Sequence, residues 1–252
     1  MAPVTTRAVL LRAYPYGETS RVLRFYTDRH GLLGVMARGI RGLSAKGGTT
    51  LATFASGDLT VYLKPQRDLQ TMKDFVCTRL RGGLGSDVLR FAGASMVAEL
   101  VLSHADHEEA HPGLFDALEE ALDALADVAA DLVPTACLAG AWRVVDAFGY
   151  APQLDPCVRC GRSIGPEEMG RFDFAAGGVR CADCAEGSTG PRVGAGARAQ
   201  LRDLLSGDLS EPITFPRRHL GLLQDFVTYH VASKPLRSLA LLGSLLPAED
   251  DA

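Results

Sequence analysis

The sequence predicts an α+β protein in which an N-terminal β-barrel precedes an α-helical domain that carries a four-cysteine insert. Three observations predict this class. Short apolar patterns with the period of a strand fill the first part of the chain, a helical period replaces them from Ser86, and two CxxC pairs interrupt the helical part. The expected parts are a barrel at 1–80, helices at 81–150, the insert at 151–192, helices at 193–246 and an acidic tail at 247–252.

Five short strands are expected in the first part, because its apolar runs alternate or are rich in β-branched residues. Clusters of turn-forming residues such as PYGE, DRHG and KPQRD separate them, and the Gly-rich stretch 41–50 is expected to be a mobile loop. Five strands in this length, with basic side chains on them, are typical of an OB-fold barrel. The expected strands are 4–14, 20–27, 32–40, 57–64 and 69–76.

Amphipathic patterns predict helices in the rest of the chain. Ser86 or Asp87 can cap the first of them, whose helical stripe includes Val88 and Phe91, and the second is expected to turn a run of carboxylates outward. The third is expected to end at Gly149. The expected helices are 86–105, 111–132, 134–149, 196–207, 217–234 and 236–246.

The net charge of −4 conceals a strong asymmetry along the chain. Residues 1–81 carry 13 Lys and Arg against 5 Asp and Glu, a net charge of +8. Residues 82–150 carry a net charge of −10 and residues 151–252 a net charge of −2. A basic barrel is typical of proteins that bind a polyanion, above all nucleic acid. The alternative is that these arginines are only solvated on an exposed sheet.

The apolar segments are too short to cross a bilayer, and Arg7 and Arg12 interrupt the first of them. We therefore expect a cytoplasmic chain with no membrane partner. In a reducing compartment, clustered cysteines at ligand spacing indicate a metal site rather than disulfides.

The two CxxC pairs predict one zinc ion. Twenty residues separate the second cysteine of the first pair from the first cysteine of the second pair, so two tight turns can bring four thiolates to one tetrahedral Zn²⁺. Four thiolates leave no open position for water, so the zinc is expected to be structural. Chance clustering, or a site that has lost its metal, is the alternative. The expected ligands are Cys157, Cys160, Cys181 and Cys184.

Signals for an enzyme are weak. His107, Glu108 and His111 match the HExxH pattern of zinc peptidases, but Pro112 and Gly113 follow at once and break the helix that such a site needs. We expect a polar loop there. The sequence holds no Walker loop and no GxSxG elbow, so the protein is expected not to be an enzyme.

The barrel offers candidate contacts to nucleic acid. Phe25 and Phe54 are expected to point inward, whereas tyrosines can stack on bases and basic side chains can reach phosphates. Alternation places Arg24 and Tyr26 on one face of the second strand and Arg21 on the other. The expected DNA-binding residues are Arg24, Arg38, Arg41, Lys46, Lys64, Arg67, Tyr26 and Tyr62, with Tyr16 as a further stacking face.

Two segments carry a family resemblance that extends over nearly the whole chain. The stretch from Gly31 to Arg41 reads G-x-x-x-x-x-A-R-G-x-R, and the stretch from Gly149 to Cys160 reads G-Y-x-P-x-L-x-x-C-x-x-C. With YGETSRVLRFYTDRHGLLGVM near the start and GGVRCADC after the first cysteines, the chain resembles the RecO family of recombination mediators. All four cysteines are present, although some members of that family lack them.

The resemblance implies an OB-fold that binds single- and double-stranded DNA and anneals complementary strands without nucleotide hydrolysis. It also implies DNA repair at the nucleoid, with RecR and the acidic tail of single-strand-binding protein as partners, to help load the RecA recombinase. The acidic middle segment would repel that tail, so we expect it to dock near Arg217, Arg218 and Arg237. The alternatives are an RNA-binding OB module and a structural zinc scaffold that binds only proteins.

Overall fold

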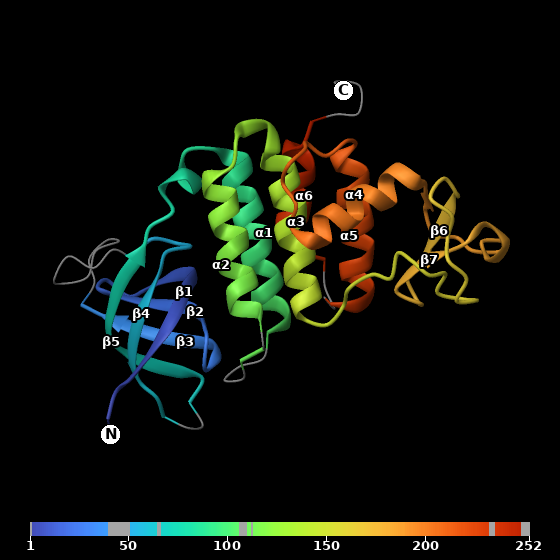
Figure 1. The fold of residues 1–252 in the computed structure, drawn as a ribbon. Coiled ribbons are helices and arrows are strands. Elements are labelled where there is room, and N and C mark those ends of the chain that lie inside the picture. Colours follow the sequence, from blue (N-terminus) through green and yellow to red (C-terminus); the bar gives the residue numbers. More distant parts are fainter. Residues whose placement is uncertain are drawn as a thin grey trace.

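The computed structural model describes residues 2–39, 51–64, 67–105, 110–111, 113–231 and 235–247. A β-barrel forms one end of the molecule, helices form the middle, and a small sheet with the cysteines forms the other end (Figure 1). This arrangement confirms the predicted fold class. Among the described residues, no helix combines the length and the apolar character that crossing a membrane requires.

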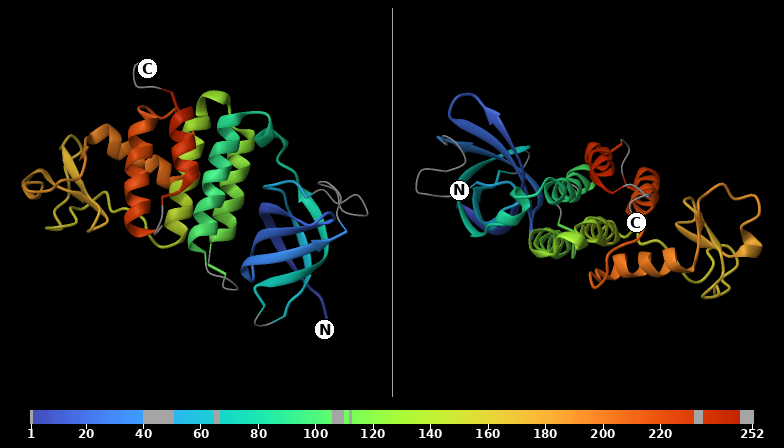
Figure 2. Two further views of the ribbon diagram at one scale, coloured as in Figure 1. Left: turned by 180° about the vertical axis from the view of Figure 1, so that it is seen from behind. Right: turned by 90° about the horizontal axis from the view of Figure 1, so that it is seen from above.

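The barrel contains five strands that close in the order β1-β2-β3-β5-β4. Neighbouring strands are antiparallel except β3 and β5, which are parallel. The first strand is the longest, because one part of it pairs with β4 and a longer part with β2. The end of the β1–β2 hairpin projects from the barrel (Figure 2). The strands are β1 Val4–Tyr16, β2 Ser20–Thr27, β3 Gly31–Arg38, β4 Ser56–Tyr62 and β5 Leu69–Arg79.

All six expected helices are present. The side chain of Asp87 caps the first by accepting a hydrogen bond from the Arg90 N–H at 2.9 Å. Pro134 stands in the first turn of the third helix, and Gly149 follows its end with a φ of +88°. The helices are α1 Val88–His104, α2 Leu114–Asp127, α3 Val133–Ala147, α4 Ala195–Ser206, α5 Pro216–His230 and α6 Arg237–Leu245.

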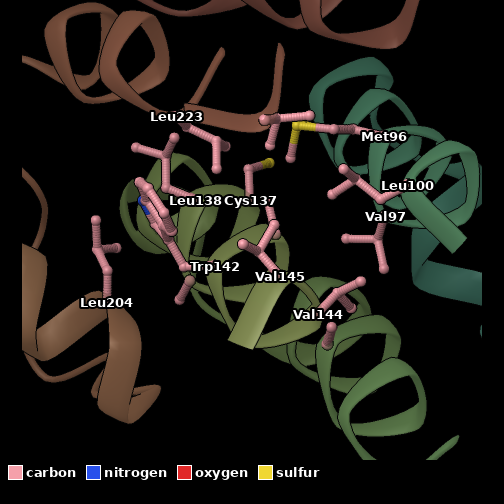
Figure 3. Packing of buried hydrophobic residues seen from close by; sticks show 14 of the residues in the cluster. Met96, Val97, Leu100, Cys137, Leu138, Trp142, Val144, Val145, Leu204 and Leu223 are labelled. Carbon is pink, nitrogen blue, oxygen red and sulfur yellow. The ribbon is translucent and has the colours of Figure 1, made fainter. Parts of the chain in front are cut away.

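Helix α3 lies at the centre of the helical part. Trp142 and Cys137 are fully buried on it, between residues of α1 such as Met96 and residues of the later helices (Figure 3). Gly93 of α1 faces Cys137 so closely that a Cβ atom there would overlap the sulfur. Burial raises the pKa of Cys137 to about 12, as expected for an inert core thiol.

The cysteine segment forms a small three-stranded sheet. Two of its strands, β6 Gly170–Asp173 and β7 Gly178–Arg180, form an antiparallel hairpin. A third strand, β8 Arg192–Val193, pairs with β6 and was not expected. Two residues are too few for a period-two pattern to be recognised.

One continuous core joins the three parts of the molecule. The outer side chains of Val9, Tyr26 and Leu32 on the barrel belong to the same buried cluster as the helices, and so does Phe172 of the small sheet. A second cluster fills the barrel interior and contains Phe25, as expected. Phe54 is also buried, but it packs between barrel and helices rather than inside the barrel.

The acidic face of α2 is turned toward the basic barrel. Arg81 lies 3.0 Å from Glu119 and 2.5 Å from Asp123, and Arg79 lies 2.6 Å from the same Asp123. The sequence led us to expect that the carboxylates of α2 face solvent. Instead, Glu119 and Asp123 pair with arginines at the end of the barrel. Some of the basic residues at the end of the barrel and some of the acidic residues of α2 thus form ion pairs between the barrel and the helices.

Candidate metal centre and nucleic-acid interface

Two tight turns position the four cysteines. In the first, the Gly161 N–H donates to the Cys157 carbonyl at 2.9 Å, and Gly161 has a φ of +75° that favours glycine. In the second, the Cys184 N–H donates to the Cys181 carbonyl at 3.1 Å. The β6–β7 hairpin delivers this second turn to the first.

The four sulfur atoms form a compact cluster. All lie within 4.8 Å of one another, and the Sγ atoms of Cys160 and Cys181 are 3.9 Å apart. A tetrahedral ion with Zn–S bonds of about 2.3 Å places its sulfurs about 3.8 Å apart. The cluster therefore has the size of a four-thiolate metal site, and within the described residues no other group of His, Cys, Asp or Glu has metal-ligand geometry.

The thiols of Cys157 and Cys184 have different environments, which shift their pKa values in opposite directions. Burial opposes ionisation of Cys157, but N–H groups of Cys181, Cys160 and Arg159 outweigh it and lower the pKa of Cys157 to about 6. Hydrogen bonds with Cys160 and then Cys181 raise the pKa of Cys184 to about 12. Four adjacent thiolates need a central cation, which explains why such clusters bind metals.

Two further residues, Arg162 and Glu168, hold the turns together, and no motif in the sequence indicated them. Glu168 accepts hydrogen bonds from the Ala182 N–H at 2.8 Å and the Gly165 N–H at 3.0 Å. Arg162 donates to both of its carboxylate oxygens, at 2.8 and 2.9 Å. The pKa of Glu168 is lowered to about 2, chiefly because the Arg162 guanidinium donates hydrogen bonds to the carboxylate. The carboxylate thus links the two metal-binding turns.

A face rich in arginine and tyrosine lies on the outer side of β1, β2 and β3. Cross-strand pairing places Arg12 beside Arg24, and Tyr16 beside Ser20, which in turn pairs with Arg38. Because side chains alternate along a strand, Tyr14 lies between Arg12 and Tyr16 on the same face. We call this surface the hairpin face: Arg12, Tyr14, Tyr16, Arg24 and Arg38.

Most of the hairpin face is open to solvent. Tyr14 and Tyr16 are 44% and 60% exposed, and Arg12 and Arg38 are exposed as well. Arg24 is half-buried, and its side chain lies over Gly34. A Cβ atom at position 34 would be only 3.1 Å from the Nη1 atom of Arg24. The face therefore combines exposed aromatic rings with cations. Arg12 and Tyr14 were not among the residues expected to bind DNA, although their period-two spacing from Tyr16 is visible in the sequence.

The β4–β5 turn borders this face. Gln70 fixes the turn by accepting from the Lys64 N–H at 2.7 Å and donating to the Arg67 carbonyl at 2.8 Å. The neighbouring Asp68 carbonyl lies against Gly34 of β3. The Asp68 carbonyl and Arg24 thus both lie beside Gly34, Lys64 and Arg67 are exposed, and Tyr62 is half-buried at the end of β4.

The prediction for Tyr26 is wrong. Its ring is fully buried between the barrel and the helices, and its hydroxyl accepts a hydrogen bond from the His111 N–H at 3.2 Å. The helical part covers this end of β2, so the ring cannot stack on a base. Two other expected contacts, Arg41 and Lys46, lie outside the described residues.

The other sequence hypotheses have mixed outcomes. His107 and Glu108 of the HExxH pattern lie outside the described residues, and the His111 ring lies against Phe148 with ring centres 5.6 Å apart. Arg217 donates to the Leu246 carbonyl near the end of α6, whereas Arg237 begins that helix. The structure therefore does not bring Arg217 and Arg237 together.

The fold and the two sites define a class: a protein with an OB-like barrel, a helical domain and a four-cysteine metal site. Family models described as "Recombination protein O N terminal" and "Recombination protein O C terminal" match residues 1–81 and 85–240. The chain therefore belongs to the RecO family, whose curated members are DNA repair proteins.

Three curated relatives illustrate the similarity, and each is named "DNA repair protein RecO". The protein from Anaeromyxobacter sp. (strain K) is 34% identical, covering 98% of this chain and 100% of the relative. That from Cutibacterium acnes is 32% identical, covering 94% and 97%. That from Desulfatibacillum aliphaticivorans is 30% identical, covering 97% and 98%.

Proposed function

We propose that this chain is a non-enzymatic recombination mediator in DNA repair. It binds single- and double-stranded DNA, anneals complementary strands and helps to load the RecA recombinase on DNA coated by single-strand-binding protein. RecR and the acidic tail of single-strand-binding protein are its direct partners. The observation that carries the DNA-binding part is the hairpin face, with exposed Tyr14 and Tyr16 beside Arg12 and Arg38.

The chemistry of this face suits annealing. Arginines contact phosphates and tyrosines stack on bases, and neither contact depends strongly on sequence. Bases held in this way keep their pairing edges available to a complementary strand. The barrel at 1–80 then acts as the DNA-binding module. No step in this function requires hydrolysis of a nucleoside triphosphate.

We propose that the four cysteines hold one structural Zn²⁺ in the insert at 151–192. Two observations support zinc. The distances between the sulfur atoms fit a tetrahedral site, and a set of four thiolates is typical of structural zinc sites. With four protein ligands, the ion has no open position for a substrate. Its contribution is to fold a segment that is too small to bury a core of its own.

Charge reversal on the hairpin face tests the proposal. Replacing Arg38 by Glu should weaken binding to all single-stranded sequences similarly, because a phosphate contact is lost. The log–log salt slope should fall by about 0.7 to 1. Annealing of strands coated by single-strand-binding protein, measured without ATP, should slow in parallel. Tyr16→Ala should reduce affinity about tenfold through lost stacking.

Arg192→Glu provides the matched control, because it makes the same charge change on an exposed arginine of the cysteine sheet. It should leave binding and annealing unchanged. If Arg38→Glu and Tyr16→Ala together bind and anneal like the parent protein, the hairpin face is not the DNA surface. Tighter binding of RNA than of DNA would favour the RNA-binding alternative instead.

A further inference from the structure

A groove lies between the barrel and the helices, where β1 and residues 53–54 meet α1 and α6. Its volume is about 380 Å³. Phe54, Phe91 and Leu241 supply apolar walls, and Arg12 and Arg237 contribute cations from the barrel and from α6. We call this the Phe91 groove.

The apolar side chains of the groove are unusually open. Phe91 is 46% exposed and Leu241 is 49% exposed, although most apolar residues of α1 and α6 are buried or half-buried. One side of the Phe91 ring lies against Phe54, with ring centres 5.6 Å apart. Exposed apolar residues gathered beside charged ones are typical of a binding site.

The groove is continuous with the hairpin face. Arg12 belongs to both surfaces, because it lines the groove and is the neighbour of Tyr14 along β1. Its guanidinium carbon lies 5.7 Å from the centre of the Tyr14 ring. A single strand that lies over Tyr16 and Tyr14 therefore reaches the groove at Arg12.

A fixed carboxylate selects the kind of group that the groove accepts. Glu99 lines the groove and accepts hydrogen bonds from the Ser238 hydroxyl at 2.5 Å, the Ser238 N–H at 2.8 Å and the Arg237 N–H at 3.2 Å. Burial opposes its ionisation, but these bonds, with the charge of Arg12, lower its pKa. The negative charge of Glu99 disfavours any anionic group next to it, so carboxylates and phosphates are expected only beside Arg12 and Arg237. An uncharged base with amino donors is compatible with Glu99.

We propose that the Phe91 groove binds one unpaired base of a single DNA strand that continues from the hairpin face. The base stacks on the exposed side of Phe91, and Arg12 and Arg237 hold the flanking phosphates. This inference rests on the proposed function and extends the DNA path from the barrel onto the helical part. Because a base in a duplex is already stacked between its neighbours, this contact is made by single strands and not by duplex.

Two variants test the groove. Phe91→Ala should lower affinity for single-stranded DNA about tenfold, since stacking on an aromatic side chain is lost. Phe91→Leu keeps the apolar volume and the fold, and it should lose most of the same affinity. Both should leave binding to duplex DNA within about twofold. Arg237→Glu should weaken single-strand binding and lower the salt slope.

Phe215→Ala and Arg218→Glu are matched controls. They change an exposed aromatic and an arginine at the start of α5, in a part of the helical domain that does not line the groove. Neither should alter DNA binding. A photoreactive 5-iododeoxyuridine strand should also crosslink to the α1 peptide that contains Phe91, and this crosslink should disappear in Phe91→Leu.

The failure of this inference is distinguishable from failure of the proposed function. If Phe91→Leu and Arg237→Glu bind single strands like the parent while Arg38→Glu and Tyr16→Ala do not, the groove lies outside the DNA path and the proposed function stands. If none of the four changes binding, both fail. Binding of an acidic peptide that is lost in Phe91→Leu, with DNA binding intact, would assign the groove to a protein partner instead.

Discussion

His219 is a buried imidazole on α5, and its Nε2 atom lies 3.1 Å from the Gln200 side-chain oxygen on α4. Burial lowers the pKa of His219 to about 4. In an unfolded chain the same group titrates near its usual pKa of about 6.5. Between these two values the unfolded chain binds a proton that the folded chain does not.

Stability should therefore fall as the pH is lowered from about 6.5 toward 4. The loss attributable to His219 should approach about 3 kcal/mol at pH 4 and be absent at neutral pH. Carboxylates also titrate in this range, so the informative quantity is the difference from His219→Gln. Urea unfolding at several pH values should give a shallower decline for the variant. Parallel curves for parent and variant would contradict the assignment.

The sequence predicted the convergence of the four cysteines better than the exposure of the barrel side chains, because the signal for the cysteines is local. A CxxC pair is a single turn, so the spacing of Cys157 and Cys160 already determines that their thiols converge. Tyr26 and Tyr16 occupy similar strand patterns, and only the position of the helical part decides that one is buried and the other exposed. The link through Glu168 was invisible for the same reason, because it depends on how the hairpin brings the Ala182 N–H of the second turn to this carboxylate.

At the scale of elements, Arg81 is the central contact between the barrel and α2. Its side chain is 1% exposed and donates to the Phe54 carbonyl at 2.8 Å and to the Ser56 hydroxyl at 2.6 Å. It also pairs with Glu119 and Asp123, which are partly exposed. The guanidinium thus satisfies buried acceptors and two carboxylates at once.

Replacing Arg81 by Met should lower the free energy of unfolding by about 3 kcal/mol, because the buried acceptors lose their donor. The matched control is Arg79→Met, which removes an exposed arginine that pairs with the same Asp123. That variant should lose less than about 1 kcal/mol. Chemical denaturation measures both. Equal losses in the two variants would show that burial of Arg81 is not decisive.

The barrel strands and the helices could be read from their own patterns, but the pairing of elements could not. All five barrel strands and all six α-helices were expected from period and turn residues, since these signals are local. The carboxylates of α2 read equally well as a solvated face. No pattern within the helix indicates that Arg79 and Arg81 of the barrel lie against it.

At the scale of the whole molecule, the barrel and the cysteine segment lie at opposite ends of the helical part (Figure 1). The cysteine segment is nevertheless part of the main core. Phe172 of β6 contacts Phe226 of α5, with ring centres 6.0 Å apart, and His230 lies 2.7 Å from the Phe174 carbonyl. The metal site is therefore coupled to α5 through packing, whereas the hairpin face is distant from it.

Loss of the metal should consequently affect stability far more than DNA binding. Native mass spectrometry should find about one zinc per chain, and Cys181→Ser should lose it. Hydrogen exchange should then rise in residues 157–193 and at the end of α5, which packs on Phe172, and remain unchanged in β1 to β3. Single-strand affinity at a temperature where the variant is folded should stay within about twofold of the parent value.

Cys77→Ser, which changes a half-buried barrel thiol, is the control and should retain the metal. If DNA affinity falls in proportion to zinc content while the barrel amides stay protected, the insert itself contacts DNA, and the separation of the two sites along the molecule is wrong.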